Sequence, residues 1–357
     1  MKKLLALVLA GVMAFSLVAC GGGSEGGDSD ADAKLKVNLL CTTLGDKSFN
    51  DSADAGLQAM EDEGLIDYTV TEYGQDNSKV KAYMEEAAED YDIIVCNNLG
   101  YGEATNWLAE NAASYPEKMF IIYDEPTVVN TDKNVQLLAY KANESDFLAG
   151  ALAALMTKTG KIGFAGGMDS PVIHDFLVGY VEGAKYVNPE IVVKYTNLNS
   201  YTDTVAGKNM GENDINAGVD ILHAVAGSAG NGYLEAAQLA GKLGIGVDSD
   251  QYESFKDAKP ELAKSIVTSS IKNVGLSLDI VIRSVIDGTY VWADYMWFGM
   301  PEGCAGIAEN ENYLALVPED VRAQMEDIKA KLADGTIVVP TAYGMTADEI
   351  ATYTMAK

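Results

Sequence analysis

Short apolar runs alternate with amphipathic patterns from residue 35 to about residue 290, and this alternation constrains the fold more than any other feature. Most runs are uninterrupted Val, Ile and Leu, which is typical of strands buried on both faces of a parallel sheet. Two successive series of such strands predict an α/β protein with two doubly wound lobes. The expected strands are 35–40, 68–73, 92–96, 119–123 and 134–140, then 161–166, 191–195, 219–225, 243–247 and 264–269.

Length and charge agree with this prediction and exclude one class of partner. The chain has 357 residues, more than one hydrophobic core usually supports, so two lobes are expected. The net charge is −28, and loss of Lys2 and Lys3 with an export signal would leave −30. A phosphate backbone would be repelled by such a surface, which argues against binding to nucleic acid.

The N-terminal segment has the pattern of an export signal. Residues 1–20 combine a basic start with an apolar stretch that is too short to be a mature membrane span. The ending Leu-Val-Ala-Cys resembles the bacterial lipobox, in which the cysteine, here Cys20, is acylated; cleavage at an A-x-A-like site is the alternative. Residues 21–34 are rich in Gly, Ser and Asp and are expected to form a flexible tether. We therefore expect a lipid-anchored protein on the extracytoplasmic face of the cell membrane.

Cysteine and histidine are too sparse for common metal sites. The three cysteines Cys41, Cys96 and Cys304 are an odd number and lack C-x-x-C spacing, so neither a disulfide framework nor a zinc site is indicated. Cys41 and Cys96 end the first and third expected strands and are expected to be small buried thiols. His174 and His223 lie inside apolar patterns and are interpreted as structural. No metal, cofactor or catalytic constellation is therefore expected.

A polar loop with one aromatic residue follows the first expected strand. It reads TTLGDKSFNDSADAGL at 42–57, and apolar residues recur at helical spacing from residue 53. Asn50 or Asp51 is expected to cap this helix. Phe49 would then lie at the carboxyl end of the first strand, the edge at which open α/β sheets bind ligands.

Other predicted strands also end in polar or glycine-rich residues. The glycines at 227, 230 and 232 offer backbone N–H donors, and a dinucleotide-binding turn is the alternative, with Asp248 as its acidic partner. The same Asp248 is a good acceptor for vicinal hydroxyls, whereas Asp250 is expected to cap the following segment; a glycosidase pair of these two is the alternative. Lys272 is expected at a helix start, where a cation is unfavourable and requires a partner such as Asp248 or a ligand oxygen.

Several motifs together resemble the basic membrane protein family. Its members are lipoproteins that serve as substrate-binding components of ABC importers, and the characterised ones mostly bind purine nucleosides. The resemblance extends from about residue 35 to beyond 340. It rests on GDKSFN (45–50), NESDFLAGALAALMTKTGKIGFAGG (143–167), NPEI (188–191), AGSAGNG (226–232), GVDSDQ (246–251) and SSIKNVG (269–275).

The resemblance implies a type I periplasmic-binding-protein fold with three crossovers, near residues 142, 272 and 308. Lobe one would be 35–142 plus 273–308, and lobe two 143–272 plus 309–357. The partners it implies are a nucleoside and an ABC permease, with the binding protein itself a monomer.

In this family the base stacks between one aromatic residue from each lobe, here Phe49 and Tyr201. The ribose is held by a carboxylate and a lysine, here Asp248 and Lys272. The expected ligand-binding residues are Thr42, Thr43, Phe49, Asn50, Tyr101, Asp124, Tyr201, Gly227, Asp248 and Lys272.

One departure from the family pattern concerns the base. Many members carry an aspartate at the end of the first strand that contacts the base, and here Cys41-Thr42-Thr43-Leu44 stands there. Losing such an acceptor changes which ligand a site selects, so the identity of the base stays open. A receptor for a sugar or another small metabolite is the alternative on this fold. An extracytoplasmic glycosidase or nucleoside hydrolase is a third.

Overall fold

The computed structural model describes residues 34–357, except 75, 98–101, 125–131 and 356–357. The predicted signal, which includes Cys20, and most of the tether therefore lie outside the described residues. Tyr101 lies outside them too. Lys34–Lys357 form one compact unit. Within the described part of this unit, no helix has both the length and the apolar character needed to cross a bilayer.

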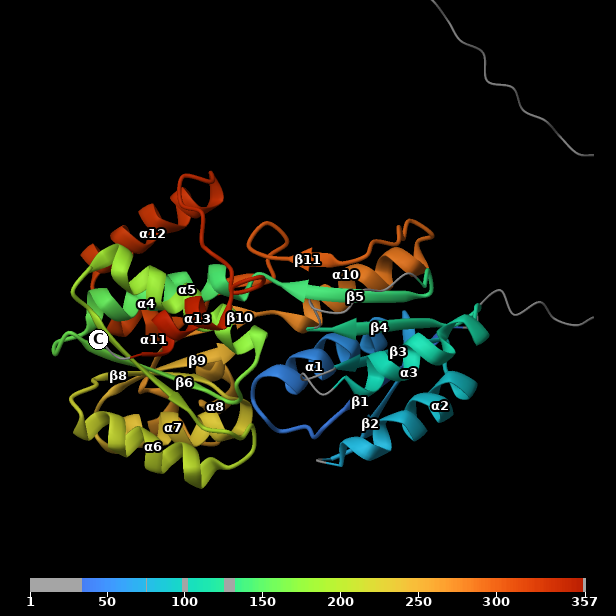
Figure 1. Ribbon diagram of the computed structural model, residues 1–357, viewed down its shortest axis with the longest axis horizontal. Helices are drawn as coiled ribbons and strands as arrows, with labels where there is room; N and C mark the ends of the chain where they lie inside the picture. Colours follow the sequence, from blue (N-terminus) through green and yellow to red (C-terminus); the bar gives the residue numbers. More distant parts are fainter. Residues whose placement is uncertain (1–33, 75, 98–101, 125–131, 356–357) are drawn as a thin grey trace, which may run out of the picture. The chain divides into compact units, whose positions relative to one another are not determined.

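Two six-stranded sheets confirm the predicted α/β architecture (Figure 1). Their strand orders are β11-β5-β4-β3-β1-β2 and β12-β10-β9-β8-β6-β7, and all pairings are parallel except β10 with β12. The first five strands of each series therefore have the doubly wound order 2-1-3-4-5. The first sheet contains β1 (Leu35–Cys41), β2 (Ile66–Glu72), β3 (Ile93–Asn97), β4 (Met119–Tyr123), β5 (Val135–Tyr140) and β11 (Met296–Phe298), and the second contains β6 (Lys161–Gly166), β7 (Val192–Asn197), β8 (Ile221–Val225), β9 (Leu243–Asp248), β10 (Ile266–Lys272) and β12 (Ala305–Ile307).

Helices cover both faces of each sheet, which is why the central strands are apolar throughout. In the first lobe α1 and α10 pack on one face, and α2 and α3 pack on the other. In the second lobe α4, α5 and α12 cover one face, and α7, α8 and α9 cover the other. The helices are α1 (Phe49–Asp62), α2 (Val80–Asp90), α3 (Glu103–Asn111), α4 (Ala142–Met156), α5 (Pro171–Val187), α6 (Thr204–Asn216), α7 (Gly227–Leu239), α8 (Gln251–Phe255), α9 (Pro260–Ala263), α10 (Val274–Ile286), α11 (Glu311–Leu316), α12 (Glu319–Ala333) and α13 (Ala347–Thr354), with short 3₁₀ turns η1 (Asn77–Lys79) and η2 (Ala112–Ser114).

The contact between α4 and α5 depends on glycine. A Cβ on Gly150 would lie 2.0 Å from the carbonyl oxygen of Tyr180, and one on Gly183 would lie 1.9 Å from that of Phe147. These distances are far below van der Waals contact, so only glycine permits the two helices to approach so closely.

Strand ends differ from the predictions in two places that affect the site. β10 continues to Lys272, so Lys272 ends a strand rather than starting a helix, because Ser270–Lys272 pair with β12. The three-residue strands β11 and β12 were not predicted. The division of the chain into lobes stays a prediction; the pairing of Ala305–Ile307 with β10 puts these residues in the second sheet, although 273–308 was expected in the first lobe.

The residues predicted to cap α1 are wrong. The helix begins at Phe49 with Ser48 as N-cap, so neither Asn50 nor Asp51 occupies the capping position. Instead the carboxylate of Asp46 accepts hydrogen bonds from the backbone N–H groups of residues 48, 50 and 51 at 2.9, 2.8 and 3.2 Å. An acid at this end of a helix is favourable because the first N–H groups have no intrahelical partners.

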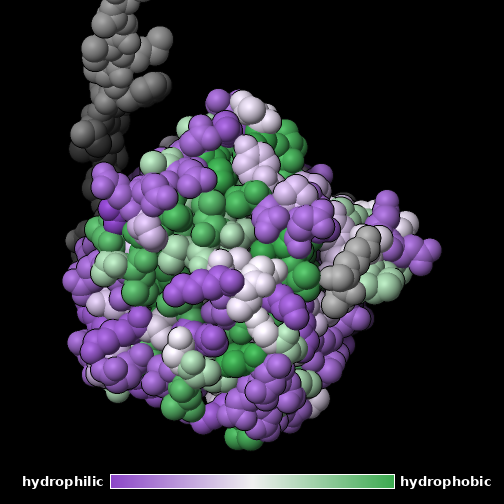
Figure 2. Space-filling model, turned by 90° about the vertical axis from the view of Figure 1, so that its left-hand side faces the viewer, coloured by the Kyte–Doolittle hydropathy of each residue, from purple (hydrophilic) through white to green (hydrophobic). Residues whose placement is uncertain are grey.

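The expectation of buried thiols at Cys41 and Cys96 is confirmed, and Cys304 is a buried free thiol too. On the face that lies at the left of Figure 1, hydrophilic side chains occupy most of the rim (Figure 2), as an acidic composition leads one to expect.

Candidate functional site

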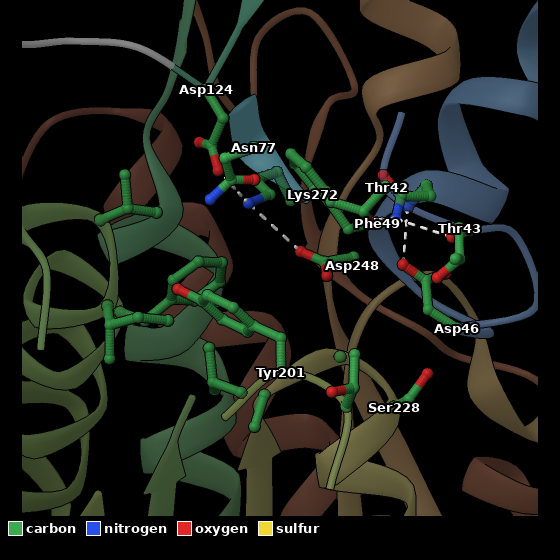
Figure 3. Close-up of a pocket in the computed structure, with 18 residues that line it drawn as sticks. Thr42, Thr43, Asp46, Phe49, Asn77, Asp124, Tyr201, Ser228, Asp248 and Lys272 are labelled. Atoms are coloured by element: carbon green, nitrogen blue, oxygen red, sulfur yellow. Dashed lines mark hydrogen bonds and ion pairs between the residues drawn. The ribbon is translucent and has the colours of Figure 1, made fainter. Parts of the chain in front are cut away.

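One pocket is lined by residues from both sheets (Figure 3). The space between its side chains is about 820 Å³ with its open mouth included. Nine of the ten predicted ligand-binding residues line it, and the tenth, Tyr101, lies outside the described residues. The nine are Thr42, Thr43, Phe49, Asn50, Asp124, Tyr201, Gly227, Asp248 and Lys272. That they bind a ligand stays a prediction.

The two predicted aromatic residues reach this pocket from different lobes. Phe49 is the first residue of α1, and its ring centroid lies 5.1 Å from that of Tyr123 at the end of β4. Tyr201 precedes α6, and its ring packs against the backbone of Gly167, where a Cβ would lie only 2.4 Å from the ring. The pocket therefore has an apolar, flat-sided part contributed by both lobes.

A lysine between two carboxylates joins the sheets at the pocket. Lys272 Nζ lies 2.9 Å from Asp124 Oδ2 and 3.4 Å from Asp248 Oδ1. Asp124 follows β4 of the first sheet, whereas Asp248 and Lys272 end β9 and β10 of the second (Figure 3). All three side chains are at least 91% buried. We refer to these residues as the Lys272 cluster; it confirms the expected pairing of Lys272 with Asp248.

Aromatic rings surround the ammonium group of this cluster. Lys272 Nζ lies 4.5 Å from the ring centroid of Phe49, 5.0 Å from that of Phe176 and 5.8 Å from that of Tyr140. These distances are within the range of cation–π attraction. Burial alone would lower the pKa of Lys272, but Asp124 and Asp248 raise it above its ordinary value. The lysine is therefore a fixed cation, unsuited to act as a base.

Asp248 has different partners at its two carboxylate oxygens. Its Oδ2 accepts a hydrogen bond from the Ser48 hydroxyl, whereas its buried Oδ1 is ion-paired with Lys272 Nζ at 3.4 Å and accepts no well-oriented hydrogen bond from the described residues. Burial raises the pKa of Asp248, and Lys272 and the Ser48 hydroxyl oppose that rise. The ion pair does not use all the acceptor capacity of the carboxylate, so Asp248 can still accept a hydrogen bond from a ligand hydroxyl.

Both acids of the cluster have unusual backbone geometry. The φ angles of Asp124 and Asp248 are 64° and 62°, in the left-handed region that non-glycine residues adopt at a cost. Such conformations persist where the surrounding structure holds them, and they concentrate at functional sites. Here they turn each carboxylate at the end of a strand into the pocket.

The glycine-rich turn has two different roles. Gly227 starts α7 with a φ of 51° and lines the pocket with Ser228, so the first N–H groups of α7 are near the cavity. Gly232 lies within α7, where a Cβ would be 1.9 Å from the carbonyl oxygen of Thr204 on α6. That glycine serves helix packing, which removes the support for a dinucleotide-binding turn.

The structure also shows the partners of Asp250, His223 and His174, the other residues considered for catalytic or ligand-binding roles. Asp250 caps α8, as predicted, and points away from the pocket to Asn310, so it forms no catalytic pair with Asp248. His223 is fully buried and paired with Asp146 at 3.1 Å, which agrees with a structural role. His174 pairs with Asp169 at 2.7 Å. In the described ranges no group of His, Cys, Asp or Glu side chains is suited to hold a metal ion.

Several pocket residues were not predicted. Asn77 follows β2 at the same sheet edge as the predicted residues, so the strand-end rule applies to it too. Its half-buried amide has no side-chain hydrogen bond within the described part of the chain. Ile173 and Phe176 come from the first turns of α5, and their apolar pattern gave no sign of a pocket role. The residues that reasoning from sequence left out are Asp46, Asn77, Val172, Ile173, Phe176, Thr202, Val225, Ala226 and Ser228.

Comparison with protein families gives one match over most of the chain. Residues 35–341 match the Bmp family, described as ABC transporter substrate-binding protein PnrA-like. The chain belongs to this family. Substrate-binding proteins of ABC transporters are extracytoplasmic proteins that bind small ligands and deliver them to permeases, and they are not enzymes.

Individual relatives and solved structures agree with membership in the Bmp family. An "ABC transporter nucleoside-binding protein BmpA" of Lactococcus lactis is 31% identical, over 96% of this chain and 100% of that protein. A "CD4+ T-cell-stimulating antigen" of Listeria innocua is 30% identical, over 95% and 99% of the two chains. An ABC transporter solute-binding protein of Aeropyrum pernix has the same fold, with a TM-score of 0.75 and 23% identity over 90% of this chain and 98% of that one.

Replacing the lysine of the Lys272 cluster tests its electrostatic role. Lys272→Met leaves Asp124 and Asp248 buried without their cation, so the free energy of unfolding at pH 7 is expected to fall by about 3–5 kcal/mol. Without Lys272 the pKa of Asp248 rises further above its unfolded value. Protonation then favours the folded state, so the deficit relative to wild type shrinks as the pH falls.

Urea unfolding between pH 4 and 8 measures both effects. Lys264→Met is the matched control, because Lys264 is an exposed lysine paired with Glu261, and its loss is expected to cost less than about 1 kcal/mol. Equal stabilities of the two variants at pH 7 would contradict the proposed role of the cluster.

Proposed function

We propose that this pocket binds a nucleoside, with purines favoured, and that the protein delivers it to the permease of an ABC importer. The observation that carries the proposal is the combination of aromatic residues from both lobes with a buried acceptor at Asp248. A nucleoside has both a flat base and vicinal hydroxyls. The name of the Lactococcus relative supports the same ligand class.

The base would occupy the part of the pocket beside Phe49 and Tyr201. Aromatic stacking contributes roughly 1–3 kcal/mol per base and makes little demand on base identity, because every base has a flat face. Phe49 is held by its contacts with Tyr123 and Lys272, so its ring is oriented before a ligand arrives.

The ribose would be held by the Lys272 cluster. Its three groups carry one positive and two negative charges, so the cluster favours a ligand that donates hydrogen bonds. Asp248 Oδ1 accepts from one hydroxyl, and Lys272 Nζ donates to a ribose oxygen. A second contribution comes from Gly227 and Ser228, where the start of α7 supplies N–H donors.

The base edge would be read without the aspartate that many family members carry. Thr42 and Thr43 line the pocket in the region where that acid is absent. The nearest acid, Asp46, is occupied by the N–H groups at the start of α1. Asn77 adds an amide that both donates and accepts, so it accommodates more than one pattern of base donors and acceptors.

Stacking is tested by removing Phe49. Phe49→Ala is expected to weaken nucleoside binding by roughly fivefold to 150-fold, because roughly 1–3 kcal/mol of stacking is lost. Isothermal titration calorimetry with a nucleoside panel measures the change, and Tyr186→Ala, which removes a half-exposed aromatic on α5, is the matched control. Unchanged affinity in Phe49→Ala would remove the stacking role. Binding of sugars alone would favour a sugar receptor on this fold.

We also propose that an acylated Cys20 anchors the protein in the membrane. The proposal rests on the lipobox-like sequence that ends at Cys20 and on the tether that follows it. Acyl chains contribute roughly 0.8 kcal/mol for each buried CH₂, so a multiply acylated cysteine is held firmly.

Expression of the full chain with labelled palmitate tests this anchor. Cys20→Ser is expected to lose the label and to leave the membrane fraction, whereas Cys304→Ser, which changes a buried thiol, retains both. A Cys20→Ser protein that stays labelled and membrane-bound would contradict lipidation at this residue.

A further inference from the structure

Acids of the first lobe accept hydrogen bonds from three backbone N–H groups of the loop before α1. In this segment, residues 45–48, Gly45 N and Lys47 N donate to the carboxylate of Asp51 at 2.6 and 3.0 Å. Ser48 N donates to Asp46 at 2.9 Å. Gly45 and Lys47 have φ angles of 91° and 60°, so the loop has a sharply turned, defined conformation. Its N–H groups are therefore directed inward, to carboxylates of the same lobe.

The carbonyl groups of the same loop are directed to the second lobe. Three consecutive backbone oxygens accept hydrogen bonds from three side chains of the α7–α8 region. The Gln251 amide also donates to Asn231 Oδ1 at 3.2 Å, which links two of these donors to each other. The bonds are Asn231 Nδ2 to Asp46 O at 3.2 Å, Gln251 Nε2 to Lys47 O at 3.1 Å and Ser249 Oγ to Ser48 O at 3.0 Å.

This contact lies beside the pocket without being part of its lining. None of the three donors is among the described residues that line the pocket. The loop they hold leads directly into Phe49, and the Ser48 hydroxyl donates to Asp248. The donors therefore act on the ligand-binding residues through the position of the loop.

We propose that Asn231, Ser249 and Gln251 form a latch that keeps the 45–48 loop against the second lobe and slows release of the ligand. They are positioning residues, since they hold Phe49 and Ser48 in place and touch no ligand. Because their acceptors are backbone oxygens, the latch depends on the conformation of the loop rather than on its side chains. Opening of the lobes requires all three bonds to break.

The expected effect of each bond is modest and measurable. A hydrogen bond of this kind changes an equilibrium by roughly twofold to tenfold. If the bonds are broken when the ligand leaves, their loss appears in the dissociation rate and not in the association rate. Ser249→Ala and Asn231→Ala are therefore each expected to raise the dissociation rate of a bound nucleoside by roughly twofold to tenfold, and the double variant by more.

Matched controls separate the latch from general effects on the second lobe. Ser254→Ala removes a hydroxyl that, among the described residues, donates to the carbonyl oxygen of Asp250 at the start of α8. Asn213→Ala removes an amide on α6 that contacts Met210. Ser249 and Asn231 are half-buried, so their truncation leaves no large cavity. Gln251 is left unchanged, because its Oε1 also accepts from Val247 N.

A second readout needs no ligand. Spin labels on cysteines introduced at Lys81 and Lys256, exposed positions in the two lobes, report the distance between the lobes in protein comprising residues 34–357. Cys41, Cys96 and Cys304 are buried, so these thiols are shielded from labelling. The Ser249→Ala/Asn231→Ala variant is expected to shift the distance distribution of the ligand-free protein to longer values.

The outcomes distinguish the latch from the proposed ligand. Faster dissociation in the latch variants than in the controls, with a longer distance between lobes, supports the latch. Rates and distances equal to those of the controls overturn it. If no nucleoside binds even to wild type, the proposed function fails, and the ligand-free distance measurement alone decides on the latch.

Discussion

The buried ion pair between Lys272 and Asp124 is the interaction on which the site depends most. It crosses from one sheet to the other at 2.9 Å, and Asp248 lies on its second-lobe side at 3.4 Å. A buried lysine requires compensation, and here two carboxylates and three aromatic rings provide it. The cluster carries one more negative than positive charge, which prepares it for a ligand rich in hydroxyl donors. Ion pairing between the lobes and the proposed recognition of the ligand thus involve the same atoms.

Beside this cluster, the N–H groups and the carbonyl groups of the 45–48 loop have partners in different lobes. Asp51 accepts from N–H groups of the loop and Asp46 from those at the start of α1, which leaves the carbonyl groups of the loop for side chains of the second lobe. Burial raises the pKa of Asp46 to about 6, although backbone donors oppose the rise. The loop that presents Phe49 is consequently fixed from both lobes, and the pocket and the latch are two parts of one contact between them.

The sequence predicts the strands well because each is an uninterrupted apolar run, and it predicts the pocket because ligands bind at the carboxyl ends of such strands. Tyr201 entered only through family resemblance. The strand β12 was not predicted, because three residues are too few to show a periodic pattern. Its pairing with β10 places Lys272 at the end of a strand and not at the start of a helix. The position of Phe176 in the pocket was not predicted, because its apolar helical pattern is typical of a residue in the hydrophobic core. The latch has no sequence signal, because its acceptors are backbone oxygens whose direction depends on φ and ψ.

Nucleoside binding is tested most directly by native mass spectrometry of residues 34–357, as purified and after incubation with nucleosides, ribose and hexoses. We expect a complex whose added mass equals that of an intact nucleoside, unaltered after long incubation, with no complex from ribose alone. Binding only to sugars, or release of a free base and ribose from the nucleoside, would contradict it.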